Sequence, residues 1–110
     1  MNDQRKKTRA PLDVYVNKYV GGVPYTARTS DISEDGMRLA KLIEPKSSKR
    51  KVGLQFQLPG SEEIIYAEGE IVRDWASPQT HVEGSGIRFT LLSERHRKMI
   101  GAYVAQAAGH

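Results

Sequence analysis

Residues 12–33 read LDVYVNKYVGGVPYTARTSDIS, and this stretch decides the fold. Its first part, residues 12–20, partly alternates apolar and polar positions and is rich in Val and Tyr, as is typical of a half-buried strand. Gly21-Gly22 is a hairpin turn signal, because glycine tolerates the positive φ that such turns need. The chain then resumes as a strand to Ser33, and Glu34-Asp35-Gly36 forms the next turn. The stretch therefore predicts an antiparallel β-hairpin followed by a third strand.

The segments after this hairpin keep a strand-like period until residue 92 and a helical period from there on. The expected strands begin at Met37 and then cover residues 52–58, 64–75 and 81–89. Ser93 belongs to a residue type that caps helices. Apolar residues then recur on one helical face, at Met99, Ile100, Tyr103, Val104 and Ala107. About six strands and one C-terminal helix predict a mainly β protein, a closed or nearly closed antiparallel barrel with the helix over an opening.

Length and composition indicate one globular domain over residues 1–110. Hydrophobic residues make up 38% and charged residues 27% of the chain, and the net charge is +4. The absence of Cys excludes a disulfide scaffold, a Cys-ligated metal and a thiol nucleophile. No window reaches 18 continuous apolar residues, and the first residues lack the apolar stretch of a signal peptide. We therefore expect a cytoplasmic protein without a membrane segment.

Motifs of catalysis are not found in the sequence. The three histidines, His81, His96 and His110, share no metal-ligand spacing. The carboxylates Glu68 and Glu70 alternate with apolar residues of a strand, which is typical of a solvated outer face. No strand–turn–helix elbow presents a serine. The sequence thus predicts a protein that is not an enzyme and that has no metal or cofactor.

Two motifs remain, Arg5-x-x-x-Arg9 and Asp31-x-Ser33-x-x-Gly36. The first is expected by chance roughly 0.7 times in such a chain, but the second only about 0.03 times. A two-residue turn at Gly21-Gly22 pairs residues whose numbers sum to 43, so Ser33 lies opposite Ala10 and Arg9 opposite Glu34. A one-residue bulge near Pro24 would bring Ile32 to the apolar face. In either register the two motifs meet at one end of the hairpin.

This combination resembles the PilZ domain family, small bacterial receptors for the second messenger cyclic di-GMP. The similarity runs over nearly the whole chain, and Gly86-Ile87-Arg88-Phe89 looks like the late G-x-x-F strand of the family. The resemblance implies a six-stranded antiparallel PilZ-type β-barrel over residues 10–90, with a mobile basic arm before it (residues 1–9) and a C-terminal α-helix after it (residues 93–107). It further implies that cyclic di-GMP is the ligand. Because residues 1–9 place four like charges together with little apolar surface, we expect the arm to be mobile without ligand and to order over a dianionic ligand, and we expect a downstream protein partner to receive that change.

The chemistry of the motif residues suits that ligand. An Arg guanidinium can fork onto a phosphate or onto guanine O6 and N7, and its plane can stack on a purine. An ionised Asp31 is an acceptor, which suits the N1–H and N2–H₂ donors of guanine. Ser33 adds a short polar group, and Gly36 lets the backbone turn or approach the ligand closely. The expected ligand-binding residues are Arg5, Lys6, Arg9, Asp31, Ser33 and Gly36, with Lys7, Trp75 and Arg88 as further candidates for the same surface.

Other interpretations stay open at this point. The Asp31 motif could be an ordinary Asx-type turn with Gly36 at positive φ, and the arginines could belong to a solvated tail. A small basic barrel could bind single-stranded nucleic acid, although the tyrosines are dispersed over several strand segments. A PilZ-like protein that has lost its ligand could act through protein contacts alone, although intact motifs disfavour this.

Overall fold

A hairpin of two strands, β2 (Tyr15–Val20) and β3 (Val23–Ser33), organises the computed structural model, which describes residues 8–41, 48–79 and 83–108. Gly21 and Gly22 join the strands with φ of 60° and 82°, the left-handed backbone whose twist matches that of a paired hairpin. Residues pair where their numbers sum to 43, from Val20 with Val23 to Tyr15 with Arg28. The predicted hairpin and its register along β2 are confirmed.

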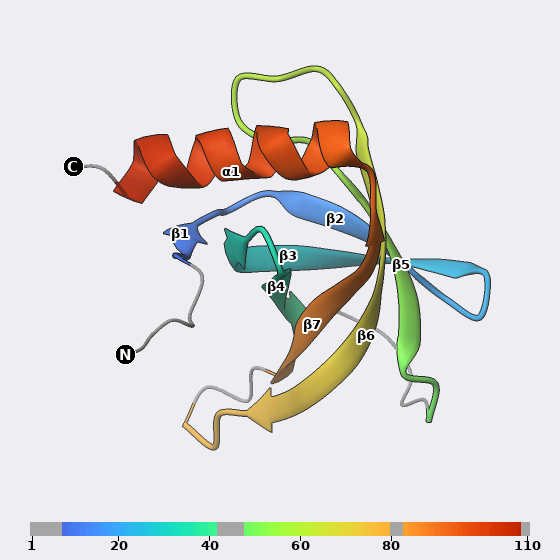
Figure 1. Cartoon of the computed structure of the whole chain (residues 1–110). Coiled ribbons are helices and arrows are strands. Elements are labelled where there is room, and N and C mark those ends of the chain that lie inside the picture. The colour runs from blue at the N-terminus through green and yellow to red at the C-terminus, as the bar shows by residue number, and fades with distance from the viewer. Residues whose placement is uncertain (1–7, 42–47, 80–82, 109–110) are drawn as a thin grey trace, which may run out of the picture.

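Within the described residues, six strands close into an antiparallel barrel (Figure 1). The barrel consists of the hairpin strands β2 and β3 together with β4 (Gly36–Lys41), β5 (Lys51–Phe56), β6 (Ile65–Ala76) and β7 (Glu83–Leu92). The order around the barrel is β3-β2-β5-β6-β7-β4, and β4 pairs with β3 to close the ring. An additional short strand, β1 (Ala10–Pro11), pairs with β3 beyond the end of β2. The predicted six-stranded barrel is therefore confirmed.

Alternate side chains of the strands fill the barrel interior. Val52, Leu54 and Phe56 of β5 are buried, as their alternation predicts. Met37 and Leu39 of β4 are also fully buried. Because successive side chains of a strand point to opposite faces, the residues between these positions lie on the outer surface of the barrel.

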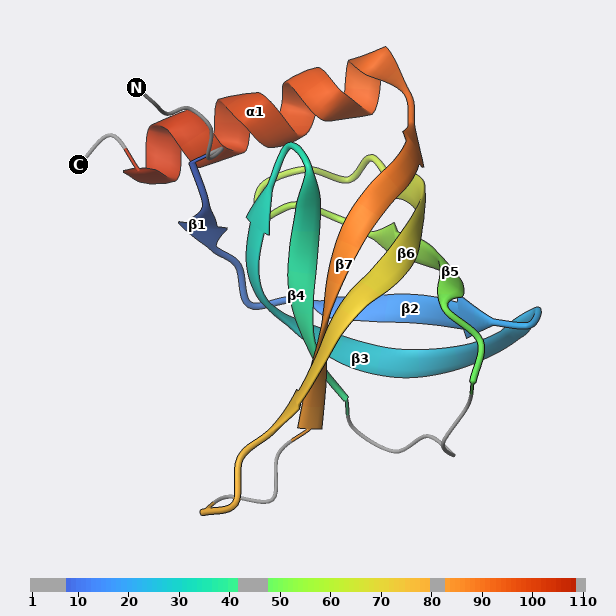
Figure 2. The same ribbon diagram turned by 60° about the horizontal axis from the view of Figure 1, so that its bottom comes forward.

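The helix α1 (Glu94–Ala108) lies across one opening of the barrel, against the tip of the β3–β4 hairpin (Figure 2). Ile100 is fully buried in the core. The Ser93 hydroxyl oxygen accepts a hydrogen bond of 3.1 Å from the backbone N–H of His96, which makes Ser93 the N-cap. The Tyr103 hydroxyl donates to the carbonyl of Pro11 at 2.6 Å. The helix contacts both β1 and β3 and thereby covers the end of the barrel at which these two strands pair.

The pairing next to β1 differs from the expected register by one residue. Ala10 pairs with Ile32, whereas an uninterrupted register places Ser33 opposite Ala10. The extra residue is Asp13, so the expected bulge near Pro24 was wrong in position although right in size. The bulge has the expected effect of bringing Ile32 to the apolar face, because this side chain is fully buried.

Thr29 explains why the bulge lies at Asp13. Its backbone N–H donates to the carbonyl of Val14, while its hydroxyl donates to the carbonyl of Leu12 at 2.6 Å. The same hydroxyl oxygen accepts from the backbone N–H of Val14 at 2.9 Å. One side chain thus supplies the partners that the interrupted ladder lacks, and the strand can accommodate an extra residue there.

Candidate functional site

Asp31 lies on the outer face of β3, close to the end that α1 covers. A second bulge, at Ser30, interrupts the pairing of β3 with β4 between Thr29 and Asp31. Bulges re-aim the side chains that follow them. The Asp31 side chain is 20% exposed, while the next residue, Ile32, is fully buried. The carboxylate therefore faces outward, and the backbone of Asp31 is paired with β1 on one side and with β4 on the other.

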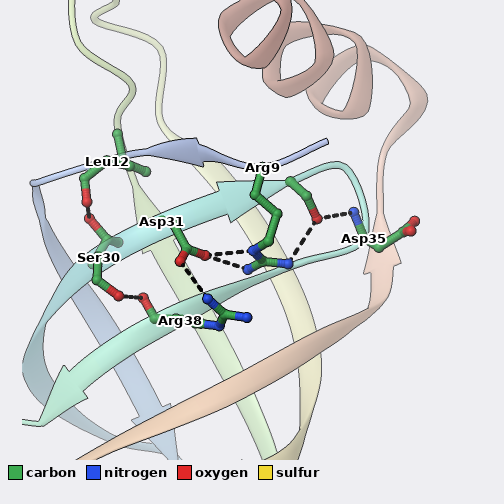
Figure 3. Close-up of polar contacts among 8 residues, drawn as sticks. Arg9, Leu12, Ser30, Asp31, Asp35 and Arg38 are labelled. Atoms are coloured by element: carbon green, nitrogen blue, oxygen red, sulfur yellow. Dashed lines mark hydrogen bonds and ion pairs between the residues drawn. The ribbon is translucent and has the colours of Figure 1, made fainter. Parts of the chain in front are cut away.

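Arg9 immediately precedes β1, and its side chain points toward Asp31 (Figure 3). Its Nε donates to Asp31 Oδ1 at 2.7 Å, and its Nη2 lies 2.6 Å from the same oxygen. Its Nη1 donates to the hydroxyl oxygen of Ser33 at 3.3 Å. Hydrogen bonds between ionised groups are among the stronger ones in proteins. Arg9 thus joins the two motifs across 22 positions of the chain, at the end of the hairpin where they were expected to meet.

Ser33 shapes the turn as well as the site. The side chain is fully buried, and its hydroxyl oxygen accepts a hydrogen bond of 3.1 Å from the backbone N–H of Asp35. This local bond stabilises the turn between β3 and β4. The Asx-type turn considered from the sequence is therefore replaced by a serine-based turn, and Asp31 remains available to the arginines.

Arg38 is a residue of this cluster that the sequence analysis missed. It lies directly opposite Asp31 in the β3–β4 ladder, and its Nη1 donates to Asp31 Oδ2 at 3.0 Å (Figure 3). The signal was present in the sequence. If Glu34-Asp35 is read as a two-residue turn, Ser33 pairs with Gly36 and Asp31 with Arg38.

Gly36 is required by packing and not by backbone conformation. It is not among the described glycines with positive φ, which corrects the alternative reading of this turn. A Cβ at this position would collide with the carbonyl oxygen of Ile87. We expected the backbone of Gly36 to approach a ligand closely, but it approaches the neighbouring strand β7 instead. This close approach lets β7 pair with the start of β4.

Arg88 and Trp75 lie on the same outer face as Arg38. Arg88 is opposite Gly36 in the β4–β7 ladder, but its Nη2 donates to Glu70 Oε1 at 2.7 Å. Trp75 is opposite Gly84 at the far end of the β6–β7 hairpin, and its ring occupies the space above that glycine. Neither residue forms a hydrogen bond or ion pair with Asp31, whose partners are Arg9 and Arg38. Arg5, Lys6 and Lys7 lie outside the described residues.

The cluster of Arg9, Asp31, Ser33 and Arg38 has a defined electrostatic character. Two guanidinium groups flank one carboxylate, so the cluster carries a net positive charge of one. The Arg9 side chain is 33% and the Arg38 side chain 50% exposed, which leaves both able to contact a bound molecule. The arrangement offers fork-shaped donors for phosphate or purine and a carboxylate acceptor for a base edge.

A separate hollow of about 590 Å³ lies over β2, β5 and β6, away from this cluster. Its lining includes Tyr19 and Tyr66, with Gly53 between them. Burial, together with the neighbouring Glu68, raises the pKa of Tyr66. The structure therefore brings together tyrosines that are far apart in the sequence, on a face that also carries a carboxylate.

Residues 8–41, 48–79 and 83–108 contain neither a cluster of metal-ligating side chains nor a membrane-spanning helix. No three His, Asp or Glu side chains there gather into a group that could hold a metal ion. No helix in this part of the chain is long and apolar enough to cross a membrane. His81 and His110 lie outside the described residues.

Comparison with known proteins places the chain in a family. The sequence model of the PilZ domain matches residues 3–106. None of the curated protein sequences compared with the chain matches it. Among solved structures, the inhibitor of motility MotI (DgrA) of Bacillus subtilis superposes with a TM-score of 0.82 at 15% identity, over 96% of this chain and 51% of that chain.

Two further similar structures contain cyclic di-GMP. The PilZ domain of YcgR from Escherichia coli with c-di-GMP has a TM-score of 0.70 at 10% identity, over 97% of this chain and 93% of that chain. PlzA of Borreliella burgdorferi in complex with c-di-GMP has a TM-score of 0.55 at 13% identity, over 89% of this chain and 46% of that chain. The chain spans about half the length of MotI and PlzA. The closed barrel with its terminal helix defines a small β-barrel domain, and the chain belongs to the PilZ domain family.

Proposed function

We propose that this protein is a cyclic di-GMP receptor whose binding site is the surface around Asp31. The observation that carries the proposal is the Arg9 guanidinium, which contacts both Asp31 and Ser33. Arg9 of the first motif thus forms one polar cluster with Asp31 and Ser33 of the second. The similarity to PilZ structures that contain c-di-GMP supports the same ligand.

In the proposed complex, basic residues bind the phosphates and base faces of the ligand, and a carboxylate binds the edge of a guanine. Arg9 and the preceding basic residues Arg5 and Lys6 contact the phosphates and the faces of the bases. Asp31 accepts hydrogen bonds from the N1–H and N2–H₂ groups of one guanine, because a carboxylate next to the phosphates themselves would be repelled. Ser33 fixes the backbone of the turn, and its hydroxyl holds Arg9 beside Asp31.

Binding of single-stranded nucleic acid is a weaker interpretation of the barrel. Tyr19 and Tyr66 do share one outer face, as stacking platforms for bases would require. However, Glu68 lines the same hollow, and the next outward residue of β6 is Glu70. Carboxylates on the stacking face oppose a phosphate backbone. The cluster of arginines lies on another part of the barrel, so the two requirements of nucleic-acid binding are not met together.

The proposed role is that of a binding domain without catalysis, which passes its signal to a protein partner. The arm of residues 1–9 orders over the bound ligand and changes shape and charge at one end of the barrel. Arg97 of α1 donates to the carbonyl of Glu34 at 2.7 Å, so the helix touches the turn that follows Asp31 and Ser33. A partner that binds near this end would sense both the arm and the helix.

Isothermal titration calorimetry with cyclic di-GMP, cyclic di-AMP and GTP in parallel tests the proposal. We expect heat from cyclic di-GMP and much weaker binding of the other two. Strongly salt-dependent binding of single-stranded oligonucleotides, with no heat from cyclic di-GMP, would instead support a nucleic-acid binder.

A further inference from the structure

Arg38 occupies the side of Asp31 that Arg9 leaves open. Arg9 donates a hydrogen bond of 2.7 Å from Nε to Oδ1 of Asp31, and its Nη2 forms an ion-pair contact of 2.6 Å with the same oxygen. Arg38 places one donor on Oδ2 at 3.0 Å. The carboxylate therefore lies between two guanidinium groups, one from the edge of the domain and one from the middle of a strand.

The number of acceptor positions limits what a bound guanine can do. An ionised carboxylate has about four lone-pair positions, two on each oxygen. In this structure Arg9 covers Oδ1 of Asp31, with a hydrogen bond from Nε and with Nη2 2.6 Å away as an ion-pair contact, whereas Oδ2 accepts one hydrogen bond, from Arg38. A guanine edge presents two adjacent donors, so it needs one position on each oxygen. At least one contact of Arg9 must be released, whereas Arg38 can stay in place.

The backbone of Arg9 is held by fewer strand pairings than the backbone of Arg38, which also makes Arg9 the easier contact to release. Arg9 precedes β1, a strand of two residues. Arg38 lies within β4, where the ladder pairs it with Asp31 of β3 on one side and with Gly86 of β7 on the other. Arg9 can thus release Asp31 and bind the ligand instead. The hydrogen bond from Arg38 to Asp31 remains in place.

We propose that Arg38 is a positioning residue that sets the selectivity of the site for guanine, an inference that rests on the proposed function. By holding Oδ2, Arg38 fixes the plane of the Asp31 carboxylate, so both oxygens face the incoming base when Arg9 turns to the ligand. Guanine offers two donors to such a pair of acceptors. Adenine offers the N6–H₂ donor but has an acceptor at N1, which the second oxygen repels. Without Arg38 the carboxylate can rotate and present a single oxygen, which adenine can also use.

The test compares Arg38→Gln, Arg38→Lys and Arg50→Gln with the wild type, by calorimetry with cyclic di-GMP and cyclic di-AMP. Arg50 is the matched control, because it also pairs with an Asp: its Nη1 lies 2.8 Å from Asp74 Oδ2, and it is 48% exposed. Thermal unfolding of each variant reports whether the barrel is intact. A bidentate base contact is worth about ten- to a hundredfold in discrimination. In Arg38→Gln we therefore expect the ratio of the two affinities to fall about tenfold or more, mostly through weaker cyclic di-GMP binding.

The outcomes separate this inference from the proposed function. Arg38→Lys should recover part of the selectivity, since it restores the charge but not the planar guanidinium fork, and Arg50→Gln should leave the ratio unchanged. An unchanged ratio in Arg38→Gln, or tighter binding of cyclic di-GMP by that variant, would overturn the role of Arg38 while the receptor function stands. Loss of both affinities by the same factor would also overturn it, because a purely structural contact acts in that way. Absence of cyclic di-GMP binding by the wild type would instead remove the proposed function.

Discussion

Arg97 in α1 and Glu34 in the β3–β4 turn are joined by a hydrogen bond of 2.7 Å, from the guanidinium Nη1 to the backbone carbonyl. A second contact supports the first, because a Cβ at Gly101 of the helix would lie 2.9 Å from the Glu34 carboxylate. The turn follows Asp31 and Ser33 directly in the sequence. The helix therefore rests on the same hairpin that carries the motif, and a change in that hairpin reaches the helix without an intermediate element.

Replacing Arg9 tests the assembly of the two motifs. In Arg9→Ala the contacts to Asp31 and Ser33 are lost together with the guanidinium that would grip the ligand. We expect cyclic di-GMP binding to weaken by about 1–3 kcal/mol, the value of a bidentate contact of this kind. Calorimetry measures the loss, and Arg50→Ala provides a control in an arginine far from the motif. Equal affinities of Arg9→Ala and wild type would place the ligand elsewhere.

Asp31→Asn tests recognition of the base edge. The amide keeps the size of the side chain but replaces one acceptor by a donor. We expect weaker binding of cyclic di-GMP and a smaller preference for it over cyclic di-AMP. Asp13→Asn is the matched control, since Asp13 also pairs with an arginine, Arg28, but on a side chain that is 69% exposed. Equal affinity of the wild type for the two dinucleotides would contradict the role assigned to Asp31.

Gly36→Ala tests the close approach of β4 and β7. The added methyl group would collide with the carbonyl oxygen of Ile87, so the ladder must shift. Overpacking of this kind destabilises by about 1–3 kcal/mol. At Gly86, in the same pair of strands, an added Cβ would lie 3.6 Å from the Cβ of Arg73, an ordinary contact. Urea unfolding should therefore show a clear loss for Gly36→Ala and a much smaller change for Gly86→Ala.

The contact between Glu63 and the start of α1 predicts a pH-dependent contribution to stability. Hydrogen bonds from Arg95 and His96 lower the pKa of Glu63 from 4.5 to about 2. The carboxyl is thus a stronger acid in the folded than in the unfolded chain. Its contribution is fully present above pH 4.5 and is lost as the pH falls toward 2.

Glu63→Gln should accordingly lower the urea midpoint at pH 7. The difference between wild type and variant should shrink as the pH falls from 4.5 toward 2. Glu62→Gln, one position earlier and exposed, controls for the loss of a surface charge. A difference that stays constant down to pH 2 would show that the ion pair is not its cause.

Amide hydrogen exchange tests how the arm responds to the ligand. Arg5, Lys6, Lys7 and Arg9 place four like charges together, and a dianionic ligand would balance them. We expect protection to rise in residues 4–10 and 31–37 together on saturation with cyclic di-GMP, and to change less in residues 94–106. Protection of residues 4–7 that is already complete in the free protein, or absent at saturation, would assign the signal to another surface.

Much of the fold was predictable because its determinants are local. The glycine pair at Gly21-Gly22 specifies a two-residue turn, and the turn specifies the register along β2. The alternation of Val52, Leu54 and Phe56 identifies an inward face, and Ser93 marks the start of the helix. The same reasoning could have found Arg38, because a turn at Glu34-Asp35 alone pairs it with Asp31.

By itself, the sequence determined the barrel, its terminal helix, and the two motifs that converge at one end of the hairpin. The tertiary structure alone decided that the bulge lies at Asp13, because the hydroxyl of Thr29 is there to replace the missing ladder bonds. It also decided that Gly36 serves the packing of β7 and that the ring of Trp75 lies on Gly84. Periodicity and turn signals act between residues close in the chain, whereas these contacts depend on how side chains and backbone of different strands pack. The contact of Gly36 with Ile87 also joins strands far apart in the chain, so only the closed barrel brings them together.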